Sequence, residues 1–279
     1  MRLPVVDTRP LFRPLCAEIV TLFRALTDDD WRRPTVAGTW RVRDVAAHLT
    51  DTALRRLSFH RDGLVPDWRP PTTNAELVAL VNELNANWVR SAARLSPRVL
   101  ADLYAAASTP LADFIESLDL HAVARIAVSW AGQTESPQWL DVGREFTEIW
   151  HHGSQIRDAV QAGPFREARW LRAVLEIAMH ALPAAYTREP DVPGGMLVVN
   201  VTGPSGGTWT LQKSDGTWSC EEGARGRGRA MTTTVTLSDQ TAWRLLFNAL
   251  HSSDLGGLVE VDGDRALALP LFRTRALVI

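Results

Sequence analysis

The stretch that most constrains the fold of this chain runs from residue 144 to residue 160. It contains no proline and a single glycine, so it is predicted to form several consecutive turns of α-helix. Glu148 and His152 lie four residues apart within it, which places both side chains on the same helix face, about 6 Å apart along the axis. The sequence therefore sets a carboxylate beside an imidazole on a helix that also carries apolar residues for a core.

A carboxylate and an imidazole are costly to bury without partners. An unpaired polar group costs roughly 2–7 kcal/mol in an apolar environment, and a charged group costs more. Either both side chains bind the same cation, or they form an ordinary solvated pair. The spacing alone leaves both interpretations open, because a Glu four residues before a His occurs by chance in many helices.

Apolar residues spaced three and four apart predict further helices on both sides of this stretch. Those before it span about residues 11–26, 42–61, 74–95 and 97–106, and one after it spans about residues 167–186. Ser96 and Pro97 form a helix-start signal, since Ser caps a helix and Pro suits its first turn. Residues 108–140 are ambiguous between strand and helix, and we expect a long crossover with some helix there.

The sequence pattern changes from helical to strand-like after a Pro- and Gly-rich linker at residues 189–195. Strands are predicted at about 196–202, 208–213, 217–220 and 232–237. Asp215-Gly216, between the second and the third, is a strong signal for a tight hairpin turn. Ser238 is expected to cap a helix, and a last helical segment follows a turn at residues 262–264. We therefore predict a helical bundle at residues 1–187, followed by a small α+β domain at residues 188–279.

Composition limits the class of protein. A chain of 279 residues exceeds the usual single-domain size, so two domains are the default. The net charge of −2 gives no reason to expect nucleic acid or an anionic membrane as a partner. Cys16 and Cys220 form no CxxC motif, no apolar run approaches the ~20 residues that cross a bilayer, and the N-terminus lacks the apolar region of a signal peptide. We expect a cytoplasmic protein, a monomer or a weak dimer, in which neither cysteine is catalytic.

Among the seven histidines, only His48 and the Glu148–His152 pair combine a helical context with an adjacent apolar stripe. Two imidazoles and one carboxylate from different helices of a bundle match the ligands of a catalytic zinc site that keeps a fourth position open. A divalent cation held in this way lowers the pKa of a bound water or thiol. The alternative for His48 is a buried histidine with ordinary partners. His151 points ~100° away from His152, so we expect it to be solvated or to support a ligand.

Three segments resemble one known family. Residues 31–51 carry two Trp, a Pro-Thr and an Asp-Val-x-x-His-Leu that ends at Leu49, and they look like the opening motif of the DinB-like, mycothiol-dependent maleylpyruvate isomerase family. Residues 148–160 are similar to the second motif of that family, and residues 262–269 resemble the end of the sterol-carrier-like domain that often follows. The resemblance implies a DinB-like four-helix bundle and a small α+β sterol-carrier-like domain.

The same resemblance implies a site and a cofactor. His48, Glu148 and His152 would bind a divalent metal, with zinc preferred. Mycothiol, a low-molecular-weight thiol, would place its sulfur on the open metal position and add to an electrophilic carbon of a small-molecule substrate. In an isomerase the thiol leaves again, whereas in a transferase the adduct is the product, and the sequence does not separate the two. Arg41 departs from the pattern, in which a Ser or Thr cap is usual.

Arginine and tryptophan side chains are the candidates for the rest of the site. Arginine grips carboxylates bidentately, so a diacid substrate favours arginines as catalytic or substrate-binding groups. The candidates of this kind are Arg90, Arg157, Arg225, Arg227 and Arg229. The candidates for walls of the cofactor pocket are Trp40, Trp88 and Trp150. The alternatives are solvated arginines and tryptophans that belong simply to the core.

Three functional hypotheses follow in order of preference. The first is a metal-dependent, mycothiol-using isomerase or S-transferase that acts on a small electrophile. The second is a non-catalytic protein whose bundle is a scaffold and whose α+β domain holds a hydrophobic ligand. The third is a biosynthetic enzyme that has recruited the same fold for other chemistry. Metal content separates the first from the second, and the nature of neighbouring genes separates the first from the third.

Overall fold

The computed structural model describes residues 3–69, 71–189, 192, 195–223, 232–250 and 252–277. The chain divides into two compact units. The helical unit comprises Asp7–Arg125 and Glu145–Phe165, and the sheet unit comprises Met1–Val6, Ile126–Arg144 and Arg166–Val278. The boundary between residues 187 and 188, which the sequence suggests for two domains, stays a prediction.

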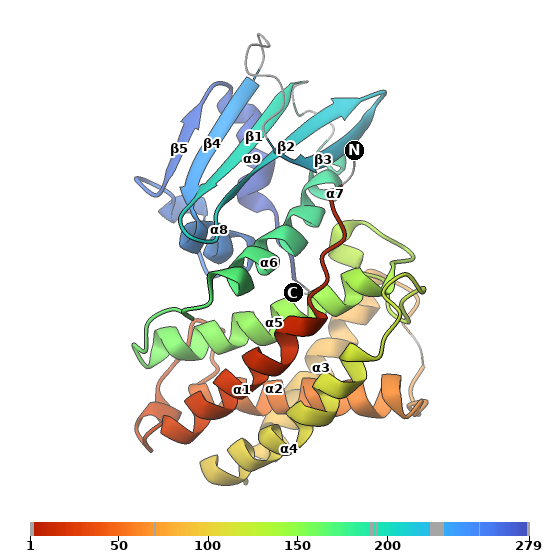
Figure 1. Ribbon diagram of the computed structural model, residues 1–279, viewed down its shortest axis with the longest axis vertical. Coiled ribbons are helices and arrows are strands. Elements are labelled where there is room, and N and C mark those ends of the chain that lie inside the picture. Colours follow the sequence, from red (N-terminus) through yellow and green to blue (C-terminus); the bar gives the residue numbers. More distant parts are fainter. Residues whose placement is uncertain are drawn as a thin grey trace. The chain divides into compact units, whose positions relative to one another are not determined.

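The helical unit is built mainly from long helices at the predicted apolar stripes (Figure 1). Its elements are α1 (Arg9–Ala25), η1 (Asp30–Arg32), α2 (Val42–Arg55), the π-helical η2 (Arg56–Arg61), α3 (Asn74–Ala92), α4 (Pro97–Glu116) and, from Glu145 onward, α5 (Gln138–Ala159). α1 and α4 pack along each other, and α2 packs against both α3 and α4. The predicted helices before residue 95 are confirmed.

Apolar side chains of α1 form the centre of this unit. Phe12 and Ile19 are fully buried. Phe12 meets Phe146 of α5 with ring centroids 5.6 Å apart, and Phe23 meets Tyr104 of α4 at 5.3 Å. Each fully buried side chain of this size contributes roughly 1.5–3 kcal/mol, so the stripe of α1 joins helices that are distant in sequence.

α4 is longer than its sequence pattern predicts. It continues past residue 106 to Glu116, with Pro110 inside it, so the predicted short helix is wrong in length. Proline has no N–H group, and the carbonyl of Ala106 therefore loses its helical partner. Leu111 and Ile115 beyond the proline are fully buried, and their burial outweighs this loss.

The crossover before α5 is shorter than expected. Residues 117–137, all of them described, include the 3₁₀ turn η3 (Ser129–Ala131), and α5 already begins at Gln138. Trp139, Leu140 and Val142 in its first turns are buried, so the helix gains apolar contacts well before residue 144. The crossover expected at residues 108–140 is therefore confirmed only for residues 117–137, because α4 and α5 occupy its two ends.

The helices of the sheet unit break where the chain carries a proline. The single helix predicted at residues 167–186 is instead α6 (Ala168–Ala178), η4 (Met179–Ala181) and α7 (Leu182–Thr187). Pro183 explains the break, because it has no N–H to donate to the carbonyl of Met179, which instead accepts the N–H of Leu182 in the 3₁₀ turn η4. The prediction of one continuous helix is therefore wrong.

The sheet has five strands in the order β3-β2-β1-β4-β5 (Figure 1). Its strands are β1 (Met196–Thr202), β2 (Gly207–Ser214), β3 (Thr217–Glu222), β4 (Thr232–Ser238) and β5 (Val259–Asp262). β1 and β4 pair in parallel, and the other neighbouring pairs are antiparallel. The remaining elements are α8 (Asp239–Leu246), η5 (Ser252–Asp254) and α9 (Arg265–Arg273).

Local turn and capping chemistry accounts for much of this sheet unit. Asp215 and Gly216 both have positive φ, as a tight hairpin between right-twisted strands requires, and the predicted turn is confirmed. Ser238 Oγ accepts the backbone N–H of Thr241 at 3.1 Å and caps α8 as predicted. The edge strand β5 is not predicted, because its four residues are too short for a pattern. The combination of a helical N-terminal part with an α+β C-terminal part confirms the predicted fold class.

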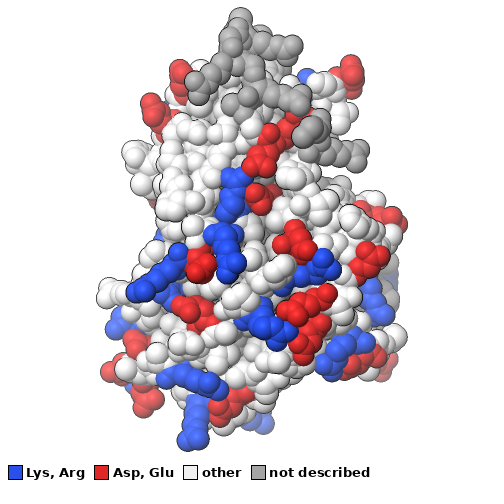
Figure 2. Space-filling model, viewed as in Figure 1, with Lys and Arg blue, Asp and Glu red and all other residues white. Residues whose placement is uncertain are grey.

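The surface carries charges of both signs. On the face shown in Figure 2, acidic and basic side chains are interspersed. On the helical unit, Arg13 of α1 is paired with Asp113 and Glu116 of α4 at 2.7 and 2.9 Å. No helix in the described part of the chain is long and apolar enough to span a membrane.

The packing of α5 on α6 yields a prediction. A Cβ atom on Gly143 would collide with the side chain of Ile177, which is fully buried. Overpacking costs typically ~1–3 kcal/mol and the gain in helix propensity is about 1 kcal/mol. We expect Gly143→Ala to lower the free energy of unfolding in urea by about 1 kcal/mol.

Two variants make this measurement specific. Gly256→Ala, where a Cβ would meet nothing within 4 Å, is the control and should be nearly neutral. Ile177→Val removes the nearest methyl group, so the cost of Gly143→Ala should shrink in that background. An equal cost in both backgrounds would contradict the steric explanation.

Candidate metal centre

Three side chains from two helices of the helical unit converge on one point. His48 Nε2 of α2 lies 3.0 Å from Glu148 Oε1 of α5, and His152 Nε2 lies 3.3 Å from the same oxygen. The two imidazole centroids are 4.6 Å apart. One potential ligand atom from each of the three residues lies within 4.8 Å of the other two. The structure thus brings together the three residues that the sequence suggests as metal ligands.

Local structure places each of these side chains. Glu148 and His152 share a face of α5 through their four-residue spacing. His48 follows Val45 and Ala46 on the buried stripe of α2, and its side chain is only 3% exposed. The start of α2 is held by Asp44, whose carboxylate accepts the backbone N–H of Arg41 at 2.9 Å. The arginine at this cap is therefore compatible with a normal entry into the helix.

Burial and mutual charge set the protonation of the cluster. Burial lowers the pKa of His48 to about 4, against the hydrogen bond to Glu148. Burial would raise the pKa of Glu148, but the charge of His152 and the hydrogen bonds of both imidazoles hold that pKa well below its usual range. Burial would lower the pKa of His152, yet the charge of Glu148 raises it above the ordinary value. The carboxylate is therefore ionised and demands positive charge beside it.

Gln155 fixes the orientation of one imidazole. Its Oε1 lies 2.8 Å from Nδ1 of His152, and an amide oxygen only accepts, so Nδ1 of His152 carries a proton. Nε2 of His152 then faces the carboxylate of Glu148 and needs either a second proton or a cation between them. His48 Nδ1 is buried without a hydrogen-bond partner among the described residues. Of these two rings, only that of His152 has a hydrogen-bond acceptor for its Nδ1 among the described residues.

The donor set fits a divalent cation of the zinc type. Nitrogen and oxygen ligands at 2.0–2.2 Å from a tetrahedral ion stand about 3.3 Å from one another. The separations of Glu148 Oε1 from the two imidazole nitrogens, 3.0 and 3.3 Å, are close to that value. Imidazoles, which bind metals in their neutral form, and an ionised carboxylate are also among the ligand types that zinc prefers.

Other residues around the cluster were not singled out by the sequence. Gln155 follows His152 by three residues, and this spacing is a signal that could have identified it. On α2, Arg55 pairs with Asp51 at 2.9 Å and donates to Asn85 of α3 at 2.7 Å. The positive charge of Arg55 helps to lower the pKa of His48, after burial and the charge of His152.

His151 is not solvated. It is 5% exposed, and its ring centroid lies 5.2 Å from that of His152. Burial lowers the pKa of His151 to about 3, so it is neutral. Of the two alternatives that the sequence left open, the structure removes the solvated one and places His151 against a member of the cluster.

The three candidate tryptophans have different positions. Trp40 lies beside the cluster, with its ring centroid 5.2 Å from that of His48. Trp88 donates its indole N–H to the carbonyl of Ala47 at 2.8 Å and so ties α3 to α2 next to His48. Trp150 is 2% exposed and packs on Phe165. It lies two residues from both α5 members of the cluster, on the opposite side of the helix.

The candidate arginines contact other groups. Arg157 donates to the carbonyls of Gly163, Ala162 and Pro164 at 2.7, 3.1 and 3.4 Å, and it lies over the ring of Phe165. It therefore holds the loop that follows α5. Arg90 is exposed on α3 and lies two positions from Trp88, which directs it away from α2. Arg225, Arg227 and Arg229 lie outside the described residues.

Two imidazoles and a carboxylate from two helices meet inside this bundle. The protein therefore belongs to the class of helical-bundle proteins with a candidate metal centre. A family profile described as the mycothiol maleylpyruvate isomerase N-terminal domain matches residues 12–157, more than half of the chain. The chain belongs to this family, and the resemblance found in the sequence is confirmed. No curated protein sequence is matched by this chain.

Solved structures agree with the fold. The crystal structure of the mycothiol-dependent maleylpyruvate isomerase is similar with a TM-score of 0.53 and 14% identity, over 94% of this chain and 95% of that one. A mutant of that enzyme is similar with a TM-score of 0.52 and 13% identity, over 87% of this chain and 88% of that one. At these identities the likeness shows the fold, while the chemistry depends on the side chains described above.

The electrostatics of the cluster can be tested in metal-free protein. The negative charge of Glu148 raises the pKa of His152, so Glu148→Gln should lower that pKa. The pKa is measured by following the ring nitrogens in an NMR titration with pH. Glu18→Gln, which removes an exposed carboxylate from α1, is the matched control and should leave the pKa of His152 unchanged. An unchanged or higher pKa in Glu148→Gln would refute the coupling.

Proposed function

We propose that this protein is a metal-dependent enzyme that uses mycothiol as a thiol cofactor. His48, Glu148 and His152 are the metal ligands, and zinc is the preferred ion. The observation that carries the proposal is the convergence of two imidazole Nε2 atoms on one carboxylate oxygen, at 3.0 and 3.3 Å. The membership of the chain in the mycothiol maleylpyruvate isomerase N-terminal domain family supports the choice of thiol.

The residues of the chain have separate tasks in this proposal. A divalent ion held by these ligands would lower the pKa of a thiol and make it a nucleophile at neutral pH. Glu148 supplies the negative charge of the ligand set. Gln155 holds the ring of His152 through Nδ1, so that Nε2 faces the site. The side chain of His48 is only 3% exposed, so water has little access to its imidazole.

The substrate is a small electrophile. A thiol held beside these ligands would supply a nucleophilic sulfur for reversible addition to a conjugated double bond, which would permit rotation about that bond and so isomerisation. If the adduct is released instead, the protein is an S-transferase. Trp40 is the aromatic residue beside the ligands, and Arg55 is an arginine on the same helix as His48 whose charge reaches it. These two are our candidates for contacts with cofactor and substrate, and Arg227, which lies outside the described residues, stays a candidate from the sequence.

The protein is further proposed to act in the cytoplasm, as a monomer or a weak dimer, on a small-molecule substrate. The two-domain division at residues 187 and 188 belongs to the same proposal. Mycothiol enzymes need a reducing compartment to keep the thiol free, and both cysteines of this chain are buried as free thiols.

Metal content tests the ligand assignment. We expect about one divalent ion per chain in the purified protein by elemental mass spectrometry, as a single three-ligand site requires. His48→Ala should lose it, and Gln155→Leu should weaken metal affinity by roughly 10–100-fold because the imidazole loses its supporting acceptor. His121→Ala, which removes an exposed histidine, should retain the ion. Retention of the full metal content by His48→Ala would refute the assignment.

Turnover tests the thiol chemistry. The protein is incubated with mycothiol and maleylpyruvate, and the products are followed by mass spectrometry and ultraviolet absorbance. Formation of the trans isomer without consumption of thiol identifies an isomerase, and accumulation of a thiol adduct with this or another electrophile identifies a transferase. His48→Ala should fall to the rate of free mycothiol. Equal rates with and without wild-type protein, over a panel of electrophiles, would exclude both activities.

A further inference from the structure

The two imidazoles of the metal cluster differ in the surroundings of their Nδ1 atoms. His152 Nδ1 lies 2.8 Å from Oε1 of Gln155, three residues further along α5. His48 Nδ1 is buried and has no hydrogen-bond partner among the described residues. A histidine that binds a metal through Nε2 carries its proton on Nδ1, and this N–H almost always donates to a carboxylate, a backbone carbonyl or water. As a metal ligand, His48 would therefore need an acceptor.

A carboxylate lies at the matching position on α2. Asp51 follows His48 by three residues, as Gln155 follows His152. Side chains three residues apart are neighbours on a helix surface, with Cβ atoms about 5–6 Å apart. Asp51 is 7% exposed, and its Oδ2 is buried without a hydrogen bond to any described residue. A nitrogen and a carboxylate oxygen on one helix face are thus both buried and both unused in hydrogen bonding.

The position of the ring proton explains why these two atoms do not bond. His48 Nε2 lies 3.0 Å from Glu148 Oε1, and an ionised carboxylate only accepts hydrogen bonds, so Nε2 carries a proton. A second proton on Nδ1 would be a buried N–H without an acceptor, which is costly. Nδ1 therefore offers a lone pair, and two acceptors do not pair. When Nε2 binds a cation instead, the ring proton moves to Nδ1, which becomes a donor on the helix face that carries Asp51.

Neighbouring side chains hold Asp51 in place. Arg55 Nε lies 2.9 Å from Asp51 Oδ2, although neither atom makes a hydrogen bond within the described part of the chain. The guanidinium is anchored from α3, because it donates to Asn85 Oδ1 at 2.7 Å. Its positive charge favours the ionised carboxylate, which has lone pairs for a further donor. The ion pair therefore restrains Asp51 and leaves it able to accept a hydrogen bond.

We infer that Asp51 is a positioning residue that accepts the Nδ1–H of His48 in the metal-loaded protein. The inference rests on the proposed function, since it takes His48 as a ligand. Each imidazole then has one acceptor three residues further along its own helix, Gln155 for His152 and Asp51 for His48. A carboxylate behind an imidazole raises the basicity of the ligand nitrogen and fixes the orientation of the ring. The centre is thereby asymmetric, with a charged acceptor behind one imidazole and a neutral amide behind the other.

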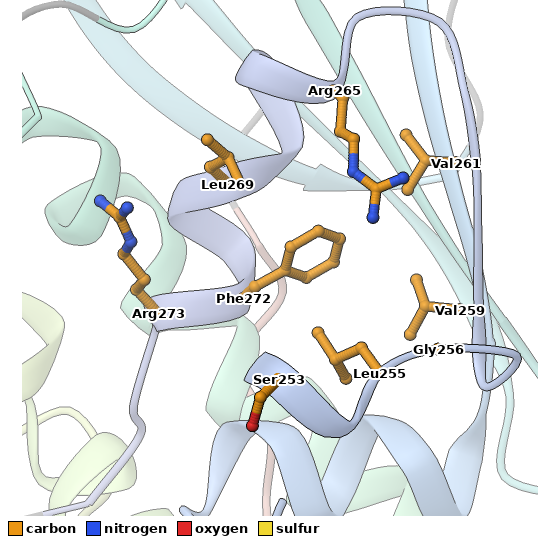
Figure 3. Close-up of a pocket in the computed structure, with 9 residues that line it drawn as sticks. All are labelled: Ser253, Leu255, Gly256, Val259, Val261, Arg265, Leu269, Phe272 and Arg273. Atoms are coloured by element: carbon orange, nitrogen blue, oxygen red, sulfur yellow. The ribbon is translucent and has the colours of Figure 1, made fainter. Parts of the chain in front are cut away.

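Zinc binding by the full chain reports on this centre. Among the described residues, His48, Glu148 and His152 are the one group of at least three His, Cys, Asp or Glu side chains that could hold a metal ion. The pocket of about 510 Å³ between β5 and α9 is lined by two arginines and by no carboxylate, imidazole or thiol (Figure 3). It offers none of the side chains that bind zinc, so a change in zinc affinity is assigned to the helical unit.

Zinc affinity is measured by competition with a coloured chelator. Asp51→Leu should weaken zinc binding roughly 10–100-fold, the range for loss of a group that supports a ligand. Asp51→Asn should weaken it less, because the amide oxygen still accepts. Asn85→Leu releases Arg55 from α3 but keeps Asp51, so it should also weaken binding less than Asp51→Leu. Asp102→Asn, which removes an exposed carboxylate of α4, is the matched control and should leave the affinity unchanged.

Nitrogen-15 NMR observes the hydrogen bond itself. In the metal-free wild type, the ring proton of His48 should be on Nε2, and in the zinc-loaded wild type it should be on Nδ1. That Nδ1 proton should show a nuclear Overhauser contact to the β protons of Asp51. In zinc-loaded Asp51→Leu its signal should move upfield, because a hydrogen bond to a carboxylate deshields the proton. A merely structural role of Asp51 would not move this signal.

The outcomes separate this inference from the proposed function. A wild-type protein that binds no zinc overturns both. If the wild type binds zinc through His48 while Asp51→Leu keeps its affinity and its Nδ1 proton signal, the role of Asp51 alone is overturned. Equal losses of affinity in Asp51→Leu and Asn85→Leu overturn it as well, since they reduce Asp51 to a tie between α2 and α3. If Asp51→Leu does not fold, a zinc-loaded wild type whose His48 Nδ1 proton shows no contact to Asp51 overturns the inference.

Discussion

The helical unit depends on one oxygen atom that two imidazoles share. Glu148 Oε1 faces His48 and His152 at 3.0 and 3.3 Å, inside a bundle whose other buried residues are mostly apolar. The side chain of His48 is 3% exposed and that of Glu148 is 30% exposed, so water offsets only part of the cost of leaving this carboxylate without positive charge beside it. The bundle can retain such a cluster only if positive charge, as protons or as a metal ion, sits between the three groups. The cost of the cluster is the physical reason for regarding it as functional.

Much of the surrounding packing brings α2 and α5 to the separation that this cluster needs. Gly153 follows His152, and a Cβ there would lie 3.0 Å from Phe165 and 3.2 Å from Ile19 of α1. The glycine therefore lets α5 approach α1 closely at the level of His152. On the other side of the site, the hydrogen bond from Trp88 to the carbonyl of Ala47 fixes α3 against α2. Both contacts constrain backbone next to a member of the cluster, and such support fixes the geometry of a site.

The sequence singled out the three residues that converge because their positions follow a helical periodicity. A carboxylate and an imidazole four residues apart share a helix face wherever the helix lies, and His48 sits on an apolar stripe that must face a core. The role of Arg157 has no such signal. Its partners are backbone carbonyls of residues 162–164, whose positions depend on the path of the loop after α5. The sequence is equally unable to predict the effect of a proline on the fold. Pro110 lies within the continuous helix α4, whereas Pro183 lies in the first turn of α7, where a helix breaks. Tertiary burial around each proline decides between these outcomes, and a single sequence does not contain it.

The evidence for the helical unit and the evidence for the sheet unit differ in kind. The family match covers residues 12–157, which include His48, Glu148 and His152. It ends before β1 begins at Met196, so it carries no information about the strands of the sheet unit. The proposed metal centre therefore rests on two independent observations, the family match and the convergence of three side chains on one carboxylate oxygen.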